Sequence, residues 1–304
     1  MKVIPITPRG YCKGVIRAIS MAKKYRDSQE PVTILGMIVH NQYVVDALEK
    51  MNIKTVDKKG ASREDLVDLV DKGTVIISAH GTSQSVIDKA LAKGLNVVDA
   101  TCLDVIKTHD LIKEKISQGF EILYVGKSGH PESEGAVAID PARIHLITKI
   151  SDFDRLDANQ KYLITNQTTM SIYDIFNIFE AAKEKFPNLE LADEICDATK
   201  VRQEAIGNVA KEVDIIYVVG DPHSNNSQKL AQIARQKTKA AVFTIETVQD
   251  INTDDLLDKK VGAVTSGAST PTYLTRQVIE YLERFDPCDK STYEKPKIEL
   301  DKVI

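Results

Sequence analysis

The sequence has no uninterrupted apolar run of about 20 residues, the length that a helix needs to cross a bilayer. It has no excess of basic residues either, because 40 Lys and Arg stand against 44 Asp and Glu, for a formal net charge of −4. This balance gives no reason to expect a nucleic-acid partner. Residues 1–8 are too short a stretch, and too soon interrupted by proline, to be a secretory signal. We therefore predict a cytoplasmic protein that binds neither membranes nor nucleic acids.

Cysteine is scarce, with four in 304 residues, and no two of them form a C-x-x-C pair. Four cysteines spread along a chain of this size do not make the disulfide framework of a small secreted domain. The lack of C-x-x-C pairs also argues against an ordinary structural zinc site. In a reducing compartment, two interpretations are left for the thiols: they are buried and inert, or they are ligands of a metal.

What the sequence does contain is a threefold repeat marked by cysteine and histidine. Cys12, Cys102 and Cys196 lie at nearly equal intervals, and each follows a strand-like run and precedes a helical pattern. A histidine follows each of them at nearly the same distance, and these histidines are His40, His130 and His223. Cysteines at repeated positions favour metal ligands over inert thiols, whereas Cys288 lies outside the repeat.

Apolar runs recur in the same order in each repeat and alternate with helical patterns. The runs are residues 3–7, 32–36, 53–56, 75–79, 96–100, 122–126, 144–148, 162–165, 189–195, 215–220, 242–245 and 261–265. Strands that alternate with helices at a fixed period predict duplicated α/β units with parallel sheets. We expect three α/β modules, residues 1–99, 100–195 and 196–286, followed by a C-terminal tail of residues 287–304.

Polar side chains follow the predicted strands, at the end of a parallel sheet where ligands bind. His80 and Thr168 come after the fourth run of the first and second repeats. Residues 126–135 place His130 two positions before Glu132 in what we expect to be a glycine-flanked turn. A carboxyl in a semi-enclosed site can have its pKa raised towards working pH, which makes Glu132 a candidate proton donor.

The third repeat carries a different kind of cluster. Ser224, Asn225 and Asn226 precede a helix that we expect to begin near Lys229, and Ser269 follows the last strand-like run. Hydroxyls, amides and backbone N–H groups at a helix start form an anion cradle suited to phosphate. Taken alone, such a run is more often a plain helix cap.

Three thiolates with no fourth suit a cubane iron–sulfur cluster that leaves one iron open. Four-cysteine ligation supports electron transfer only, whereas an open iron can bind a substrate oxygen and also supply electrons. The residues alone therefore predict reductive or eliminative chemistry on a small phosphorylated alcohol.

The motifs resemble those of the 4-hydroxy-3-methylbut-2-enyl diphosphate reductase family over essentially the whole chain. They are, in order, Arg9-Gly-Tyr-Cys12-x-Gly-Val, Val-His40-Asn, Ser-Ala-His80-Gly, Asp-Ala-Thr-Cys102, Gly-His130-Pro-Glu132, Gln-Thr168-Thr and Ser224-Asn-Asn226. The chain departs from the family pattern at Lys13, at Leu103 and at Asn225.

The resemblance implies three pseudo-threefold-related α/β modules with mostly parallel sheets, arranged as a trefoil around a central [4Fe–4S] cluster. One cluster per chain would be held by Cys12, Cys102 and Cys196. The implied reaction is the reductive dehydroxylation of 4-hydroxy-3-methylbut-2-enyl diphosphate to isopentenyl and dimethylallyl diphosphate, the last step of the methylerythritol phosphate pathway. A ferredoxin or flavodoxin would supply the electrons.

The resemblance also implies roles for residues of this chain. Glu132 would deliver a proton, while His130 and Thr168 would place the substrate hydroxyl and relay protons. The residues implied to bind the diphosphate are His40, His80, Ser224, Asn225, Asn226 and Ser269.

Two alternatives stay open. Another [4Fe–4S] enzyme of the hydratase or dehydratase type, acting on a small phosphorylated alcohol, would share the open iron but need no external electrons. A non-catalytic regulator that binds zinc or a cluster would have no affinity for a diphosphate.

Overall fold

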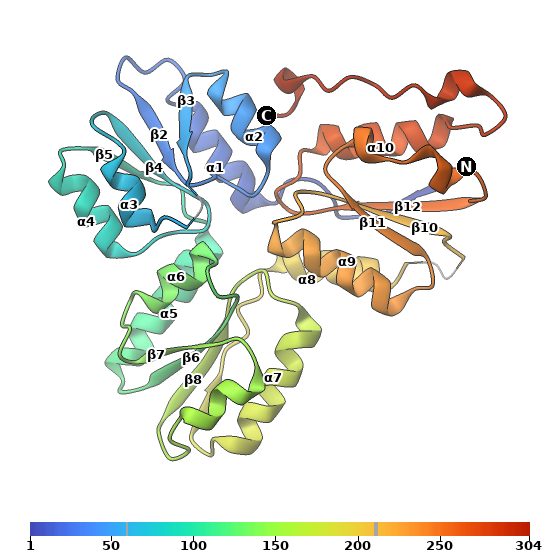
Figure 1. The fold of residues 1–304 in the computed structure, drawn as a ribbon. Helices are drawn as coiled ribbons and strands as arrows, with labels where there is room; N and C mark the ends of the chain where they lie inside the picture. The colour runs from blue at the N-terminus through green and yellow to red at the C-terminus, as the bar shows by residue number, and fades with distance from the viewer. Residues whose placement is uncertain (59, 210–211) are drawn as a thin grey trace. The chain divides into compact units, whose positions relative to one another are not determined.

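The computed structural model describes residues 1–58, 60–209 and 212–304, and the strands in these ranges form three four-stranded sheets, all parallel (Figure 1). The first sheet has the order β3-β2-β4-β5 and contains β2 (Val32–Leu35), β3 (Ile53–Val56), β4 (Thr74–Ile77) and β5 (Asn96–Asp99). The second has the order β7-β6-β8-β9 and contains β6 (Glu121–Val125), β7 (Ile144–Ile147), β8 (Tyr162–Asn166) and β9 (Leu189–Leu191). The third has the order β1-β12-β10-β11 and contains β1 (Lys2–Pro5), β10 (Ile215–Val219), β11 (Ala241–Ile245) and β12 (Val261–Ser266). The predicted α/β fold with parallel sheets is confirmed.

The N-terminal strand β1 belongs to the third sheet. It pairs in parallel with β12, with Lys2 opposite Val261 and Pro5 opposite Val264, and it is the blue strand among orange ones in Figure 1. It takes the edge position that β5 and β9 take in the other sheets, and each of these three strands precedes a repeat cysteine. The sequence analysis assigned β1 to the module of residues 1–99. Position along the chain does not show which sheet has an edge strand available for pairing, so the pairing of β1 with the third sheet was missed.

Helices connect the strands and cover the sheets. The α-helices of the described ranges are α1 (Lys13–Lys23), α2 (Gln42–Glu49), α3 (Arg63–Asp68), α4 (Gln84–Ala92), α5 (Leu103–Ser117), α6 (Pro131–Val137), α7 (Ile172–Lys185), α8 (Asp197–Gly207), α9 (Asn225–Lys237) and α10 (Thr272–Arg284). Short 3-10 helices are η1 (Ile150–Arg155), η2 (Val248–Asp250), η3 (Thr253–Leu256), η4 (Lys290–Tyr293) and η5 (Leu300–Lys302). Several helices start at a serine whose hydroxyl accepts a backbone N–H of the first turn, as Ser83 does for α4 and Ser171 for α7.

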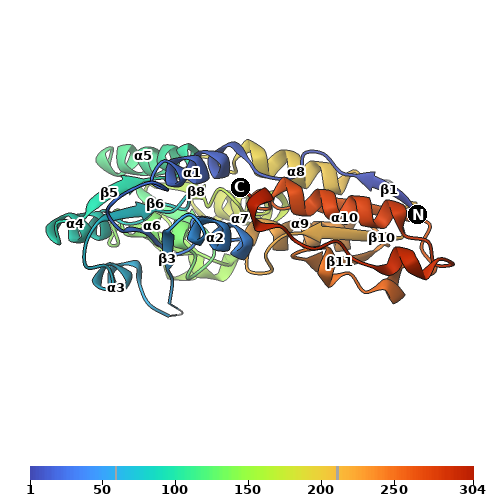
Figure 2. The same ribbon diagram turned by 90° about the horizontal axis from the view of Figure 1, so that it is seen from above.

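The central strands β2, β4, β8 and β10 are buried along their whole length, and β6 and β12 are buried after their first residue, as continuous apolar runs in a parallel sheet predict. All five residues of β10 are buried. On this sheet, Val278 and Leu282 of α10 pack with Val264 of β12 in one hydrophobic cluster, and α10 lies along the strands (Figure 2). No helix in the described part of the chain is long and apolar enough to cross a membrane.

Contacts between residues divide the chain into two compact units. Unit 1 consists of Met1–Ile16, Val39–Lys50 and Asp197–Ile304 and contains the third sheet. Unit 2 consists of Arg17–Ile38 and Met51–Cys196 and contains the first and second sheets. The C-terminal tail is part of unit 1, where Val303 is buried and its carbonyl accepts a hydrogen bond from the Tyr11 hydroxyl at 3.0 Å.

Candidate functional site

The three repeat cysteines occupy equivalent positions in the fold, each just before the helix that follows an edge strand. Cys12 precedes α1, Cys102 precedes α5 and Cys196 precedes α8. All three cysteines are half-buried, whereas Cys288 is exposed. Leu103, where the chain departs from the family pattern, is the exposed first residue of α5, so this helix begins directly after its cysteine.

The backbone fixes each cysteine in the same way. Each cysteine N–H donates to a carbonyl in the loop that follows the strand beside its own edge strand. These hydrogen bonds run from Cys12 to Ala268 after β12 (3.0 Å), from Cys102 to Ala79 after β4 (2.9 Å) and from Cys196 to Thr168 after β8 (3.2 Å). The predicted site residues His80, Thr168 and Ser269 lie in these same three loops, so every cysteine is tied to a loop that carries one of them.

In unit 2, Glu132 is a buried carboxyl held by Thr168. The Thr168 backbone N–H donates to Oε1 at 2.7 Å and the Thr168 hydroxyl donates to Oε2 at 3.1 Å. Burial raises the pKa of Glu132 from 4.5 to about 7, a shift that the two hydrogen bonds oppose and the charge of Asp104 adds to. A carboxyl with this pKa can hold or release a proton near neutral pH.

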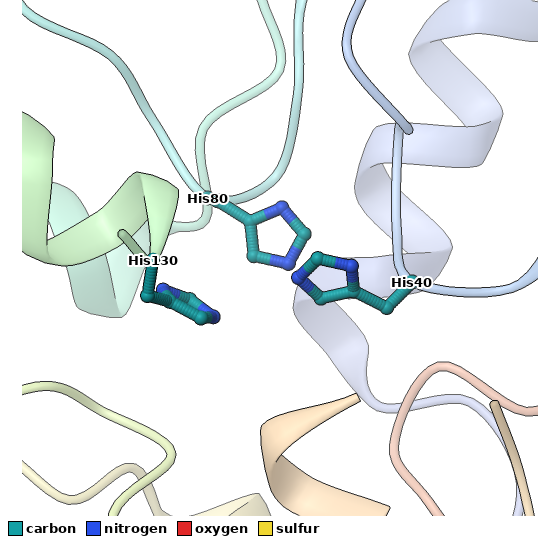
Figure 3. Close-up of side chains that lie close together, drawn as sticks. All are labelled: His40, His80 and His130. Atoms are coloured by element: carbon teal, nitrogen blue, oxygen red, sulfur yellow. The ribbon is translucent and has the colours of Figure 1, made fainter. Parts of the chain in front are cut away.

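His130 lies at the start of the same helix. Its Nδ1 accepts a hydrogen bond from the Glu132 backbone N–H at 3.2 Å, so in the neutral ring the proton is on Nε2. The ring of His80 packs edge-on against it, with centroids 5.4 Å apart and planes at 85° (Figure 3). The imidazoles of His80 and His130 are therefore in contact in unit 2, and Glu132 lies in the first turn of the helix that begins after His130.

The sequence-based prediction of a turn over residues 126–135 was wrong in its second half. Pro131–Val137 form α6, with His130 as the N-cap residue and Glu132 in the first turn. Proline at the first helical position and acidic residues in the first turn are signals of a helix start. The interpretation gave more weight to the flanking glycines and missed these signals.

Gln167 is a positioning residue that the sequence interpretation did not single out. Its buried Oε1 accepts hydrogen bonds from the Lys127 N–H at 3.0 Å and from the Ser133 hydroxyl at 3.2 Å. Its Nε2 donates to the Thr169 hydroxyl at 2.8 Å. Gln167 thereby holds the loop after β6 against the end of β8, where Thr168 lies. Its place directly before Thr168 was the available signal.

In unit 1, α9 begins earlier than the sequence predicted. The helix starts at Asn225 rather than near Lys229, because the Ser224 hydroxyl accepts the Ser227 N–H at 3.4 Å and caps it. Asn225 and Asn226 therefore lie in the first helical turn, where both are buried. The polar run had been interpreted as a loop, since asparagine and serine are common in both places.

Two polar side chains of this first turn, those of Asn226 and Ser227, find no hydrogen-bond partner in the described part of the chain. Both side-chain atoms of Asn226, and the Ser227 hydroxyl, are buried without a hydrogen-bond partner among the residues that the structure describes. Gly267 lies directly against them, since a Cβ there would be 2.2 Å from Ser227 Oγ and 3.5 Å from Asn226 Nδ2. Buried polar groups without partners are rare and costly, and at a helix N-terminus they fit a polar, anionic ligand.

The loop after β12, which contains Gly267, also contacts the segments that carry His40 and Cys12. The Ser269 hydroxyl donates to the backbone carbonyl of His40 at 3.1 Å, and Ser266 Oγ accepts the Gly10 N–H at 2.7 Å, two residues before Cys12. Of the predicted site residues, unit 1 contains Cys12, His40, Ser224, Asn225, Asn226 and Ser269. Unit 2 contains Cys102, His80, His130, Glu132, Thr168 and Cys196.

The chain is similar to known proteins over its whole length. A family model described as LytB protein matches residues 3–283. The 4-hydroxy-3-methylbut-2-enyl diphosphate reductase of Geobacillus sp. (strain WCH70) is 48% identical over 309 aligned positions, which cover 100% of this chain and 98% of that protein.

The similarity extends to solved structures. That of the E-1-hydroxy-2-methyl-but-2-enyl-4-diphosphate reductase from Plasmodium falciparum matches with a TM-score of 0.85 at 32% identity, covering 92% of this chain and 87% of that one. That of an (E)-4-hydroxy-3-methyl-but-2-enyl diphosphate reductase, described as the terminal enzyme of the non-mevalonate pathway, matches with a TM-score of 0.66 at 26% identity, covering 94% and 100%.

Proposed function

Because the chain belongs to the LytB family of 4-hydroxy-3-methylbut-2-enyl diphosphate reductases, we propose that it reduces (E)-4-hydroxy-3-methylbut-2-enyl diphosphate to isopentenyl and dimethylallyl diphosphate. The reaction breaks the allylic C–O bond, consumes two electrons and two protons, and releases water. The observation that carries the proposal is Glu132, a buried carboxyl whose pKa is raised to about 7 and whose two oxygens are fixed by Thr168. It is a proton donor placed before substrate arrives.

A [4Fe–4S] cluster, one per chain, is the cofactor that the donor set fits. Three half-buried thiols at equivalent helix starts, with no fourth cysteine in the repeat, match a cluster that has three protein ligands. Cys12, Cys102 and Cys196 would hold it. When bound, the cluster supplies electrons and an open coordination position.

The residues of unit 2 would deliver the proton. Glu132 would protonate the leaving hydroxyl group, and the two hydrogen bonds from Thr168 keep its carboxyl plane from rotating. His130 carries its proton on Nε2, because Nδ1 already accepts the Glu132 N–H. Acid catalysis by a positioned carboxyl is typically worth about 10²- to 10⁴-fold in rate.

The residues of unit 1 would bind the diphosphate, with His80 contributing from unit 2. The unsatisfied Asn226 amide and the N–H groups of the first turn of α9 offer donors to phosphoryl oxygens. The set proposed for the diphosphate is His40, His80, Ser224, Asn225, Asn226 and Ser269. His130 and Thr168 would contact the hydroxyl end of the substrate.

We further propose that residues 1–99, 100–195 and 196–286 are three duplicated modules, with 287–304 as a tail. The shared strand order of the three sheets supports this, β1 being the strand that completes the third sheet. The enzyme would work in the cytoplasm and take electrons from a ferredoxin or a flavodoxin.

The proposal is tested by metal and sulfide analysis, with a visible spectrum, on protein purified without oxygen. We expect about four iron and four sulfide per chain and a broad brown absorbance. Turnover of the diphosphate substrate should then require a reduced electron donor. Turnover without one would indicate a hydratase or dehydratase, and bound zinc without affinity for inorganic diphosphate would indicate a regulator.

A further inference from the structure

Each repeat cysteine is followed by a basic residue in the second turn of its helix. These residues are Arg17 after Cys12, Lys107 after Cys102 and Arg202 after Cys196. Neither the sequence analysis nor the proposed function gives any of the three a role. Their side chains share one kind of contact, which is with the segment that immediately precedes another repeat cysteine.

Arg202 makes the most buried of these contacts. Its guanidinium, 4% exposed, donates from Nη2 to the Gly10 carbonyl at 2.7 Å and from Nη1 to the Ala198 carbonyl of its own helix at 2.8 Å. Gly10 precedes Cys12 by two residues and has φ +77°, and a Cβ there would be 2.4 Å from Thr272 Oγ1. The carbonyl that Arg202 binds is therefore held in place from both sides.

Arg17 contacts the residue directly before Cys102. Its Nη1 donates to the Thr101 carbonyl at 2.6 Å. Asp99 binds the same residue, accepting the Thr101 N–H at 2.9 Å and the Thr101 hydroxyl. A partly buried cation and a carboxylate thus fix the entry to the Cys102 turn.

Lys107 contacts the segment before Cys196. Its ammonium group lies 3.1 and 3.3 Å from the carboxylate oxygens of Glu194, which precedes Cys196 by two residues. The Glu194 side chain is 11% exposed and the Lys107 side chain 70%, so water screens this pair much more than it screens Arg202. The Glu194 N–H also donates to Asn166 Oδ1 at 3.2 Å.

The three contacts follow a cyclic order. The helix after Cys12 holds the segment of Cys102, the helix after Cys102 holds that of Cys196, and the helix after Cys196 holds that of Cys12. We propose that Arg17, Lys107 and Arg202 are positioning residues of the metal site, each fixing one cysteine, and that their charges raise the reduction potential of the bound cluster. This inference rests on the proposed function and concerns how its cysteine site is built.

Electrostatics gives the direction of the effect. A cluster on three thiolates is anionic, and its reduced form carries one more negative charge, so nearby cations favour reduction. A buried guanidinium acts through a medium of low polarity, whereas an exposed ammonium is screened by water and salt. The expected order of influence is therefore Arg202, then Arg17, then Lys107.

The positioning role is tested on the metal-free protein by amide hydrogen exchange, so it does not depend on the cluster. In Arg202→Met, the peptide that contains Cys12 should exchange roughly tenfold to hundredfold faster, the factor expected for loss of a hydrogen bond from a charged donor. The peptide of Cys102 should be unchanged. Arg17→Met should instead affect the Cys102 peptide, and Arg202→Lys should restore most of the protection at Cys12.

The matched control is Arg26→Met, which removes an exposed arginine that pairs only with its neighbour Asp27 among the contacts the structure describes. It should leave all three cysteine peptides unchanged. Equal acceleration of all three peptides in Arg202→Met and in Arg17→Met, or none in either, would overturn the one-cation, one-cysteine assignment. If Arg202→Met does not fold, Arg17→Met decides the question alone, since its side chain is only partly buried.

The electrostatic role is tested on the cluster-loaded protein by an anaerobic redox titration followed by its visible spectrum. The midpoint potential should become more negative in Arg202→Met, less so in Arg17→Met and least in Lys107→Met, with Arg202→Lys close to the parent protein. Unchanged potentials would reject this role. A parent protein that takes up no iron and sulfide would instead reject the proposed function, while the exchange experiment would still report on the three contacts.

Discussion

Glu132 of unit 2 is satisfied by its own neighbours, whereas Asn226 of unit 1 is not satisfied by any residue that the structure describes. Both oxygens of Glu132 accept hydrogen bonds from Thr168, and its backbone N–H is bonded to His130. The Asn226 side chain, equally buried, makes no hydrogen bond within the described residues. The difference predicts that the proposed acid is organised before substrate binds, while the proposed anion site is completed by its ligand.

This contrast fits the two tasks. A proton donor that is fixed in advance is more effective, because no free energy is then needed to bring it into position during the reaction. A binding site gains from donors that lack partners, because the ligand then satisfies groups whose burial otherwise destabilises the protein. Three substitutions, two of them with a matched control, test whether the two units differ in this way.

The largest effect is expected from Glu132→Gln, which keeps the shape of the side chain and removes its acid. Turnover should fall by about 10²- to 10⁴-fold, while the cluster spectrum stays unchanged. The measurement is donor-dependent turnover under anaerobic conditions. Glu134→Gln is the matched control, because Glu134 lies exposed in the same helix and should be dispensable. Full activity in Glu132→Gln would contradict the role of Glu132.

The same carboxyl makes stability depend on pH. Its pKa is about 7 in the folded state and 4.5 without burial, so between these values only the unfolded chain ionises and the fold loses stability as pH rises. Above about pH 7 the cost is constant at about 3 kcal/mol, and below 4.5 it is absent.

Glu132→Gln removes this cost at every pH. The free energy of unfolding of the variant minus that of the parent protein should therefore increase by about 3 kcal/mol as pH rises from about 4.5 to about 8. The measurement is urea denaturation of the two metal-free proteins. A difference between the two proteins that stays constant with pH would show that Glu132 is not held protonated by burial. Turnover of the parent protein should likewise fall as pH rises through about 7.

For unit 1, Asn226→Leu should weaken binding without destabilising the free protein. The leucine replaces an amide that has no partner, so the free energy of unfolding should stay equal or rise. The affinity for inorganic diphosphate, measured by calorimetry, should fall by roughly 10- to 150-fold, the loss expected for one hydrogen bond to a charged ligand. Lower stability with unchanged affinity would mean that the amide has a structural partner after all.

The fold was largely predictable from sequence because its signals are local. Each strand is a short apolar run, and the cysteines mark the period of the repeat. The pairing of β1 with β12 was not predictable, since it joins the two ends of the chain. Among the site residues, Glu132 and Thr168 could be named from sequence, but the pKa of Glu132 depends on burial that only the folded chain creates. The cyclic contacts of Arg17 and Arg202 likewise depend on which loops fold together.

The smallest effect separates helix capping from ligand binding at Ser224. Ser224 and Ser171 are both buried N-cap serines, for α9 in unit 1 and α7 in unit 2. Replacing either by alanine should cost about 1 kcal/mol of stability, because a first-turn N–H loses its acceptor. If unit 1 holds the anion, Ser224→Ala should also weaken the binding of inorganic diphosphate several-fold, whereas Ser171→Ala should not. Equal losses of stability with no change in affinity would make Ser224 a cap and nothing more, and would leave Asn226 as the residue on which the binding role of α9 depends.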